Sequence, residues 1–111
     1  METLPAQYAR LLHVGFLVLQ QTLDSQDYDW LPVEMDLLHN VPSLISERNV
    51  ERHRYFWFGE RKYYIDRVAA SGRDDLNARM RTFYLPVWQE MEPILLEWFA
   101  DESAPKSPSA R

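Results

Sequence analysis

Apolar residues recur every three to four positions along most of the chain, which is the spacing of one face of an α-helix. Four such windows predict helices over residues 5–23, 30–39, 50–71 and 75–100. The Asn-Gly and Asp-Gly pairs that are typical of β-hairpins do not occur in the sequence. The pattern therefore predicts an all-α fold.

Short polar residues and glycine mark several of the expected helix ends. Thr3 precedes Pro5, which fits an N-cap followed by a proline in the first turn. Asn49 or Ser46 is expected to cap the helix over 50–71, and Gly72 to close it. These residues satisfy backbone groups that a helix end leaves without a partner.

The shorter second helix has its own boundary signals. Asp29 is expected as its N-cap and Asn40 as its left-handed C-cap, while Asp74 is expected to cap the last helix. Residues 42–45 are expected to form one short turn that points Leu44 inward, together with the neighbouring isoleucine.

Two prolines interrupt the last predicted helix. Pro86 and Pro93 are seven residues apart, so both lie on one face, opposite the apolar stripe. A proline inside a helix removes a hydrogen bond and bends the axis. We expect a bent helix here rather than a break near Leu85, because the apolar stripe stays in register across both prolines.

Four helices with short connections pack best as an antiparallel four-helix bundle. Residues 1–100 are expected to form a single helical domain, since 111 residues leave no room for two ordinary domains. Residues 101–111 are rich in Ser, Pro and Ala, have no apolar face, and are expected to be a disordered tail.

The composition excludes several classes of function. The chain has no cysteine, which excludes disulfides and thiolate chemistry, and its net charge of -5 argues against nucleic acid as a partner. The longest strongly apolar run, residues 14–19, is far shorter than the roughly 20 residues that span a bilayer. No membrane association is therefore expected, and a cytoplasmic location is the default.

The charge is distributed in blocks. Residues 1–47 carry a net charge of -6, residues 48–81 carry +4, and residues 82–102 carry -5. The basic block is mainly the third helix. It is expected to pair with the acidic parts of its own bundle or with an acidic surface on a second subunit.

No sequence motif indicates an enzyme or a cofactor. There is no glycine-rich phosphate loop, no His-Glu-x-x-His and no Gly-x-Ser-x-Gly. The pair Asp36 and His39 has the spacing of a di-iron ligand motif but occurs only once. Three histidines from three helices could hold one metal ion, yet only His53 lies on an apolar arc, whereas His13 and His39 do not. We predict no catalytic residues, no metal and no cofactor.

Two acids fall on apolar faces. Glu34 lies among apolar residues of the second helix, and Glu60 lies among aromatic residues of the third, close to His53 and Arg61. A buried carboxylate must be paired or hydrogen-bonded. One interpretation is a Glu–Arg or Glu–His network, with Tyr and Trp donors nearby, that fixes helix register. Another is a polar pocket between the second and third helices that binds a small ligand or a cation, and the third is simple exposure at the edge of the face.

The third helix carries six aromatic residues within ten positions, with arginines between them. Its apolar arc is wider than one helix of a monomeric bundle needs. The candidate interface residues are Arg54, Tyr55, Trp57 and Phe58, because aromatic residues and Arg are enriched at protein interfaces. The alternatives are a crowded core with arginine stems lying over it and, more remotely, single-stranded nucleic acid.

The sequence therefore predicts a non-enzymatic protein–protein interaction module, either a homodimer or an adaptor, antitoxin or immunity-type protein. A homo-oligomer is the simplest form of this prediction. The alternative function is a bundle that binds a small ligand or metal at Glu34, His53, Glu60 and Arg61.

Overall fold

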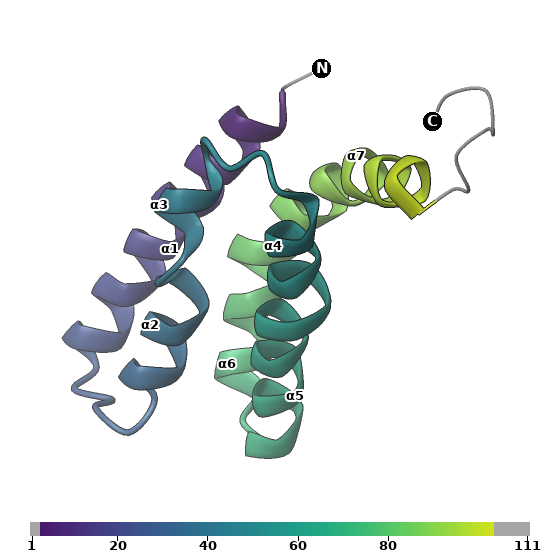
Figure 1. The fold of residues 1–111 in the computed structure, drawn as a ribbon. Helices are drawn as coiled ribbons and strands as arrows, with labels where there is room; N and C mark the ends of the chain where they lie inside the picture. Colours follow the sequence, from purple (N-terminus) through teal and green to yellow (C-terminus); the bar gives the residue numbers. More distant parts are fainter. Residues whose placement is uncertain (1–2, 104–111) are drawn as a thin grey trace, which may run out of the picture.

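The structure is a computed structural model and describes residues 3–103. It is all-α, with the four-helix arrangement that the sequence predicts. The first predicted helix is α1 (Leu4–Asp24), and the second is α2 (Leu31–Leu38), which is followed by the short α3 (Val41–Leu44). α2 and α3 run back along α1 in the first half of the fold (Figure 1).

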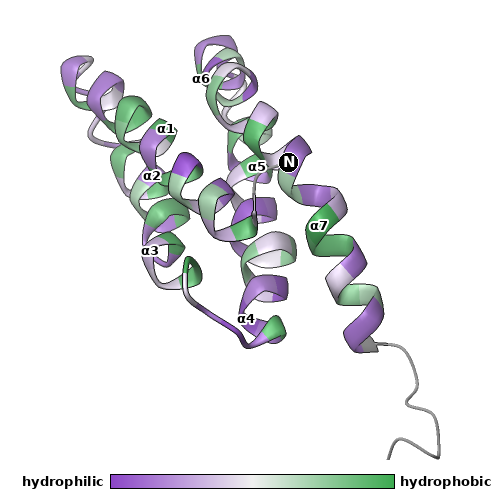
Figure 2. Cartoon of the chain, turned by 90° about the horizontal axis from the view of Figure 1, so that it is seen from above, coloured by the Kyte–Doolittle hydropathy of each residue, from purple (hydrophilic) through white to green (hydrophobic). Residues whose placement is uncertain are grey.

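The third and fourth predicted helices form the second half of the fold. The third consists of α4 (Val50–Arg54), η1 (Tyr55–Glu60) and α5 (Arg61–Ser71), and the fourth of α6 (Asp74–Arg79), η2 (Met80–Tyr84) and α7 (Leu85–Ser103). The chain reverses direction at the turn between α5 and α6, and α7 then diverges from the axis of α6 (Figure 1). Apolar and polar residues alternate along each helix, as expected where one face is buried (Figure 2).

η1 and η2 are π-helical turns, in which the backbone N–H bonds five residues back. The N–H of Arg61 donates to the carbonyl of Phe56, and that of Leu85 to the carbonyl of Met80. η2 comes just before Pro86, which has no N–H to donate to the helix. The helix continues through both prolines and changes direction, as predicted, and both proline rings are exposed.

Several expected helix ends are confirmed. The Thr3 hydroxyl accepts a hydrogen bond from the N–H of Ala6, Asn49 caps the N–H of Glu51, and Gly72 is left-handed with φ of 65°. The turn over 42–45 is confirmed as α3, and it buries Leu44.

Three expected caps are wrong, because helix ends shift by a residue where neighbouring groups compete. Trp30 occupies the N-cap of α2 instead of Asp29, since the carbonyl of Asp27 already accepts from Trp30. Arg73 occupies the N-cap of α6, with Asp74 in the first turn. Asn40 is right-handed, and its side chain donates to Glu60 rather than ending a helix. α7 also continues to Ser103, past the expected end at 100, and the rest of the predicted tail lies outside the described residues.

The core is formed by one face of every helix. Aromatic residues contribute much of its volume, and the largest fully buried side chains include Trp57, Trp88, Tyr8, Tyr64, Tyr84 and Phe56. Tyr84 stacks on Trp88 with ring centroids 5.3 Å apart, and Tyr64 meets both rings edge-on. Such stacked and edge-to-face pairs add to the free energy of burial.

Gly15 sets how closely α1 approaches α2. A Cβ placed on Gly15 would lie 2.5 Å from Cδ2 of the buried Leu38, whereas a Cβ on Gly59 would lie 3.8 Å from the nearest atom, in the exposed ring of Tyr55. We expect Gly15→Ala to destabilise the protein by about 1 kcal/mol or more, because overpacking exceeds the gain in helix propensity. The matched change Gly59→Ala should stabilise it by about 0.5–1 kcal/mol. Urea titration of both variants measures this, and a stabilised Gly15→Ala would contradict the close contact.

Candidate functional site

Glu34 is fully buried in the core. Its Oε1 accepts hydrogen bonds from the indole N–H of Trp30 and the hydroxyl of Tyr64, both at 2.7 Å, and its Oε2 accepts from the hydroxyl of Tyr84 at 2.8 Å. The donors come from the start of α2, from α5 and from η2. One carboxyl group therefore joins both halves of the fold.

The predicted burial of Glu34 is confirmed. Its hydrogen bonds come from Tyr and Trp donors, and none of the Arg and His side chains in the described part of the chain, which were also expected, bonds to it directly. Arg79 contributes favourable charge at longer range, while its guanidinium donates to Thr22 Oγ1 at 3.2 Å. Neutral donors satisfy the carboxyl without burying a second charge, whose desolvation would be costly. The spacing of Trp30 and Glu34, four residues apart on one helix, was the available sequence signal.

Burial shifts the titration of this cluster. It raises the pKa of Glu34, although the three hydrogen bonds and Arg79 oppose the shift. Burial also raises the pKa of Tyr64 and Tyr84, and the nearby Glu34 charge adds to this. Both tyrosines therefore remain protonated donors at neutral pH.

The raised pKa of Glu34 predicts a pH dependence of stability. The folded protein holds the proton of Glu34 more tightly than the unfolded protein does. The stability that Glu34 contributes is therefore fully present below its unfolded pKa, about 4.3. That contribution is lost as the pH rises through the folded pKa. We expect the free energy of unfolding, measured in urea between pH 4 and 8, to fall with pH relative to that of Glu34→Gln. A constant difference between the two proteins would contradict this assignment.

His53 is buried at a separate place, under the end of α7. Its Nε2 donates to the carbonyl of Glu47 at 3.0 Å, because a carbonyl can only accept, and Nδ1 of the neutral ring accepts from the Tyr8 hydroxyl at 2.8 Å. The Trp98 ring lies 4.8 Å away. Burial lowers the pKa of His53, and the Glu47 carbonyl and carboxylate oppose the shift. The arrangement ties α4 to α1.

Glu60 is half-buried at the junction of η1 and α5. Its two carboxylate oxygens accept from Nδ2 of Asn40 at 3.2 and 3.0 Å. It lines a cavity of about 430 Å³ between α2 and η1–α5. Tyr55 and Glu60 also line a second hollow of about 300 Å³, towards α3 and α4. The carboxylate thus lies at a surface groove.

Arg61 covers the core from the side of α7. Its guanidinium lies 3.8 Å from the centre of the Trp57 ring, and Nε donates to the Trp57 carbonyl at 3.0 Å. Burial lowers the pKa of Arg61, and Glu92 opposes the shift. This contact combines a cation–π interaction with a hydrogen bond.

The four predicted site residues thus have separate sets of partners. Glu34 bonds to core rings, His53 to Tyr8 and Glu47, Glu60 to Asn40, and Arg61 to Trp57. Of these four residues, only Glu60 lines the cavity between α2 and α5. Tyr64, whose hydroxyl donates a hydrogen bond to Glu34, also lines it. A cavity therefore lies between these helices, but sequence analysis did not identify Gly59 and Tyr63 at its wall.

The predicted interface residues also divide into two groups. Tyr55 is 67% exposed and Phe58 57% exposed, as an interface requires. Trp57 is only 1% exposed, so its assignment to the surface was wrong: its ring belongs to the core. Arg54 is half-buried and belongs to neither group. It pairs with Glu51 and donates to the Phe99 carbonyl at 2.8 Å.

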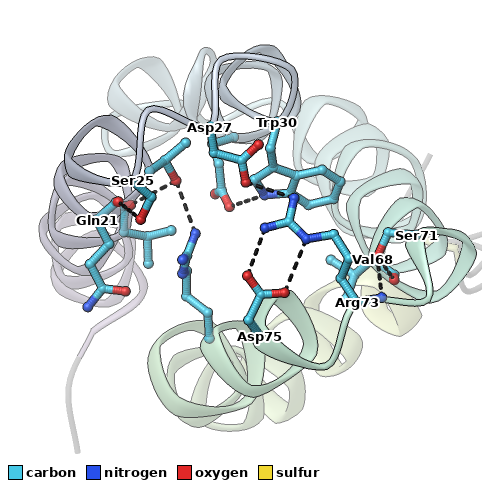
Figure 3. A network of polar contacts seen from close by, with 12 residues as sticks. Gln21, Ser25, Asp27, Trp30, Val68, Ser71, Arg73 and Asp75 are labelled. Atoms are coloured by element: carbon cyan, nitrogen blue, oxygen red, sulfur yellow. Dashed lines mark hydrogen bonds and ion pairs between the residues drawn. The ribbon is translucent and has the colours of Figure 1, made fainter.

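The basic block pairs mostly with nearby acids. Arg52 pairs with Glu47, and Lys62 with Asp66 one turn away. A longer-range pair is seen at the end of the bundle, where the guanidinium of Arg73 lies between Asp27 and Asp75 (Figure 3). These pairs are largely exposed and contribute little stability. The Arg73–Asp27 pair links the α1–α2 connection to the α5–α6 turn.

Neither a metal centre nor a membrane span is found in the described part of the chain. Within residues 3–103, no group of three or more His, Asp or Glu side chains is placed to hold a metal ion. No helix in this range has the length and hydropathy needed to cross a bilayer. Comparisons with protein-family models, curated proteins and solved structures found no significant match.

Proposed function

We propose that this chain is a non-enzymatic protein–protein interaction module. The proposal rests on one observation: Tyr55, Phe58 and Tyr63 are 67%, 57% and 49% exposed in a helix whose other rings complete the core. We call these three residues the ring surface; Tyr55 and Tyr63 lie on the α2 side of the helix and Phe58 on the α7 side. Aromatic side chains are enriched where proteins bind one another and supply much of the binding energy.

The fold does not require the ring surface. The neighbouring rings of Phe56, Trp57 and Tyr64 are buried and already fill the core side of this helix. Phe58 contacts the ring of Phe99, with centroids 5.8 Å apart, but remains 57% exposed. Exposed rings that add little to folding are best accounted for by a partner that covers them.

The partner of the proposed module is a protein, either a second copy in a homodimer or a different chain. Arg54 lies beside the ring surface with its guanidinium 5.5 Å from the Phe99 ring, and would supply a basic edge to the contact. Arginine next to aromatic residues is a typical composition of such contacts.

Site-specific photo-crosslinking in cells tests the proposal. A benzophenone amino acid replaces Phe58 in one variant and exposed Asn77 on α6 in the control. We expect a discrete crosslinked product from position 58 and none from position 77. Its mass distinguishes a second copy from another protein. The absence of a product from position 58 and from position 55 would contradict the proposal.

A second candidate function is the binding of a small ligand between α2 and η1–α5. The cavity of about 430 Å³ at Glu60 favours it, since this size is within the range of small-molecule sites. Native mass spectrometry of the purified full chain tests this candidate. A bound species that disappears in Glu60→Gln would support it, and the bare protein mass would count against it.

A further inference from the structure

The cavity at Glu60 combines aromatic rings with carboxylates. Tyr55, Tyr63 and Tyr64 line it together with Asp36 and Glu60, and Gly59 leaves its wall without a side chain between the exposed rings. A cation is attracted both to the face of an aromatic ring and to a carboxylate. The lining therefore has the chemistry of a cation site.

The cavity has no cation of its own. Its lining includes no Lys or Arg from the described part of the chain, and one histidine, His39. Neither Asp36 nor Glu60 forms an ion pair with any described residue, and Glu60 is bonded only by the uncharged amide of Asn40. This contrasts with Asp27, Glu47 and Asp66, each of which pairs with a neighbouring cation.

We propose that the cavity binds an arginine side chain presented by a segment of the partner protein. The inference rests on the proposed function, because it assigns the cavity to a protein partner. The planar guanidinium can stack on the Tyr55 ring and donate two parallel hydrogen bonds to the Glu60 carboxylate. The chain itself uses the same stacking, with Arg61 over Trp57 at 3.8 Å.

The groove is longer than one side chain. The second hollow, of about 300 Å³, shares Tyr55 and Glu60 with the first and is otherwise lined by Asn40, Leu44, Glu51 and Arg52, whose charge is paired with Glu47. A single small cation fills only one of the two hollows. An extended segment places its arginine in the larger hollow and a flanking residue in the smaller one, which favours a peptide over a free small molecule.

Gly59 provides a way to block the cavity without changing its charge. A Cβ at this position makes only ordinary contact, at 3.8 Å, so a larger side chain can enter the cavity without strain against the backbone. Gly59→Leu is therefore expected to fill the site, while Glu60→Gln keeps the shape and removes the charge. Glu97→Gln, an exposed acid on α7, is the matched control.

Nuclear magnetic resonance titration of the full chain tests the inference. The probe is N-acetyl-arginine N-methylamide, and the neutral control probe is the corresponding citrulline compound. We expect saturable shifts at the amides of Gly59 and Glu60 with the arginine probe only, at millimolar affinity. Glu60→Gln should weaken binding about tenfold and Gly59→Leu should abolish it, while Glu97→Gln has no effect. Equal shifts with both probes, or no saturation, would overturn the inference.

The source of the arginine is tested with an octapeptide that carries one arginine between serine and glycine residues. We expect it to bind about fivefold more tightly than the single-residue probe, because its flank occupies the second hollow. Equal affinity would indicate a free small cation and would overturn the assignment to a partner segment. This titration needs no partner, so it can fail while crosslinking from position 58 succeeds, and the reverse.

Discussion

Replacing Glu34 with alanine is expected to lower the free energy of unfolding by about 3–5 kcal/mol. The change leaves the indole N–H of Trp30 and the hydroxyls of Tyr64 and Tyr84 without their acceptor in a fully buried site. Each buried donor without a partner costs about 1–3 kcal/mol, and the lost side chain also leaves a cavity. Urea unfolding followed by circular dichroism measures the loss.

Glu34→Gln is the matched control for this prediction. Its amide oxygen can accept from Trp30 and Tyr64, and its NH₂ can donate to the Tyr84 hydroxyl, which rotates to accept. We expect less than half of the loss seen with alanine. Equal losses in the two variants would show that the hydrogen bonds to the three rings do not stabilise the fold.

Two adjacent rings are expected to differ sharply when each is replaced by alanine. Trp57→Ala should cost about 3–5 kcal/mol, because its ring is 1% exposed and lies beneath Arg61. Phe58→Ala should cost less than about 1 kcal/mol, since its ring is 57% exposed.

The measurement is the free energy of unfolding of each variant at the same pH and salt concentration. A further variant, Tyr55→Ala, belongs to the exposed group and should behave like Phe58→Ala. If Phe58→Ala proved as costly as Trp57→Ala, the ring surface would be part of the core rather than a surface free for a partner.

The helices could be predicted because their signals are local. The apolar stripe of residues 5–23 can be recognised from that segment alone. Thr3 begins a helix through a hydrogen bond to a nearby backbone N–H, and Gly72 ends one through its left-handed dihedral angles. The bend of the last helix follows from the chemistry of its prolines. Such features do not depend on which helices pack together.

The π-helical turns could not be predicted from periodicity. A turn with a bond from Arg61 to Phe56 contains one residue more than an α-helical turn, so it rotates every later side chain around the axis. An ideal wheel at 100° per residue places Glu60 in the middle of the arc that holds His53, Phe56, Trp57 and Tyr64, whereas the structure leaves Glu60 half-buried.

The partners of Glu34 were hidden for a different reason. The position of Glu34 on an apolar face was enough to predict a buried, hydrogen-bonded carboxyl. Its partner Tyr84 is 50 residues away, and only tertiary packing brings η2 against α2 and α5. An arginine partner was the natural expectation from charge, but two hydroxyls and an indole satisfy the carboxyl without desolvating a cation.

The central claim is that the ring surface serves binding and not folding, and one variant tests both halves of it. Phe58→Glu is made in the protein that carries the benzophenone amino acid at position 55, with Asn77→Glu as the matched control. We predict that Phe58→Glu changes the free energy of unfolding by less than about 1 kcal/mol and abolishes the crosslink from position 55. A folded Phe58→Glu protein that still forms the same crosslink in undiminished yield would contradict the claim.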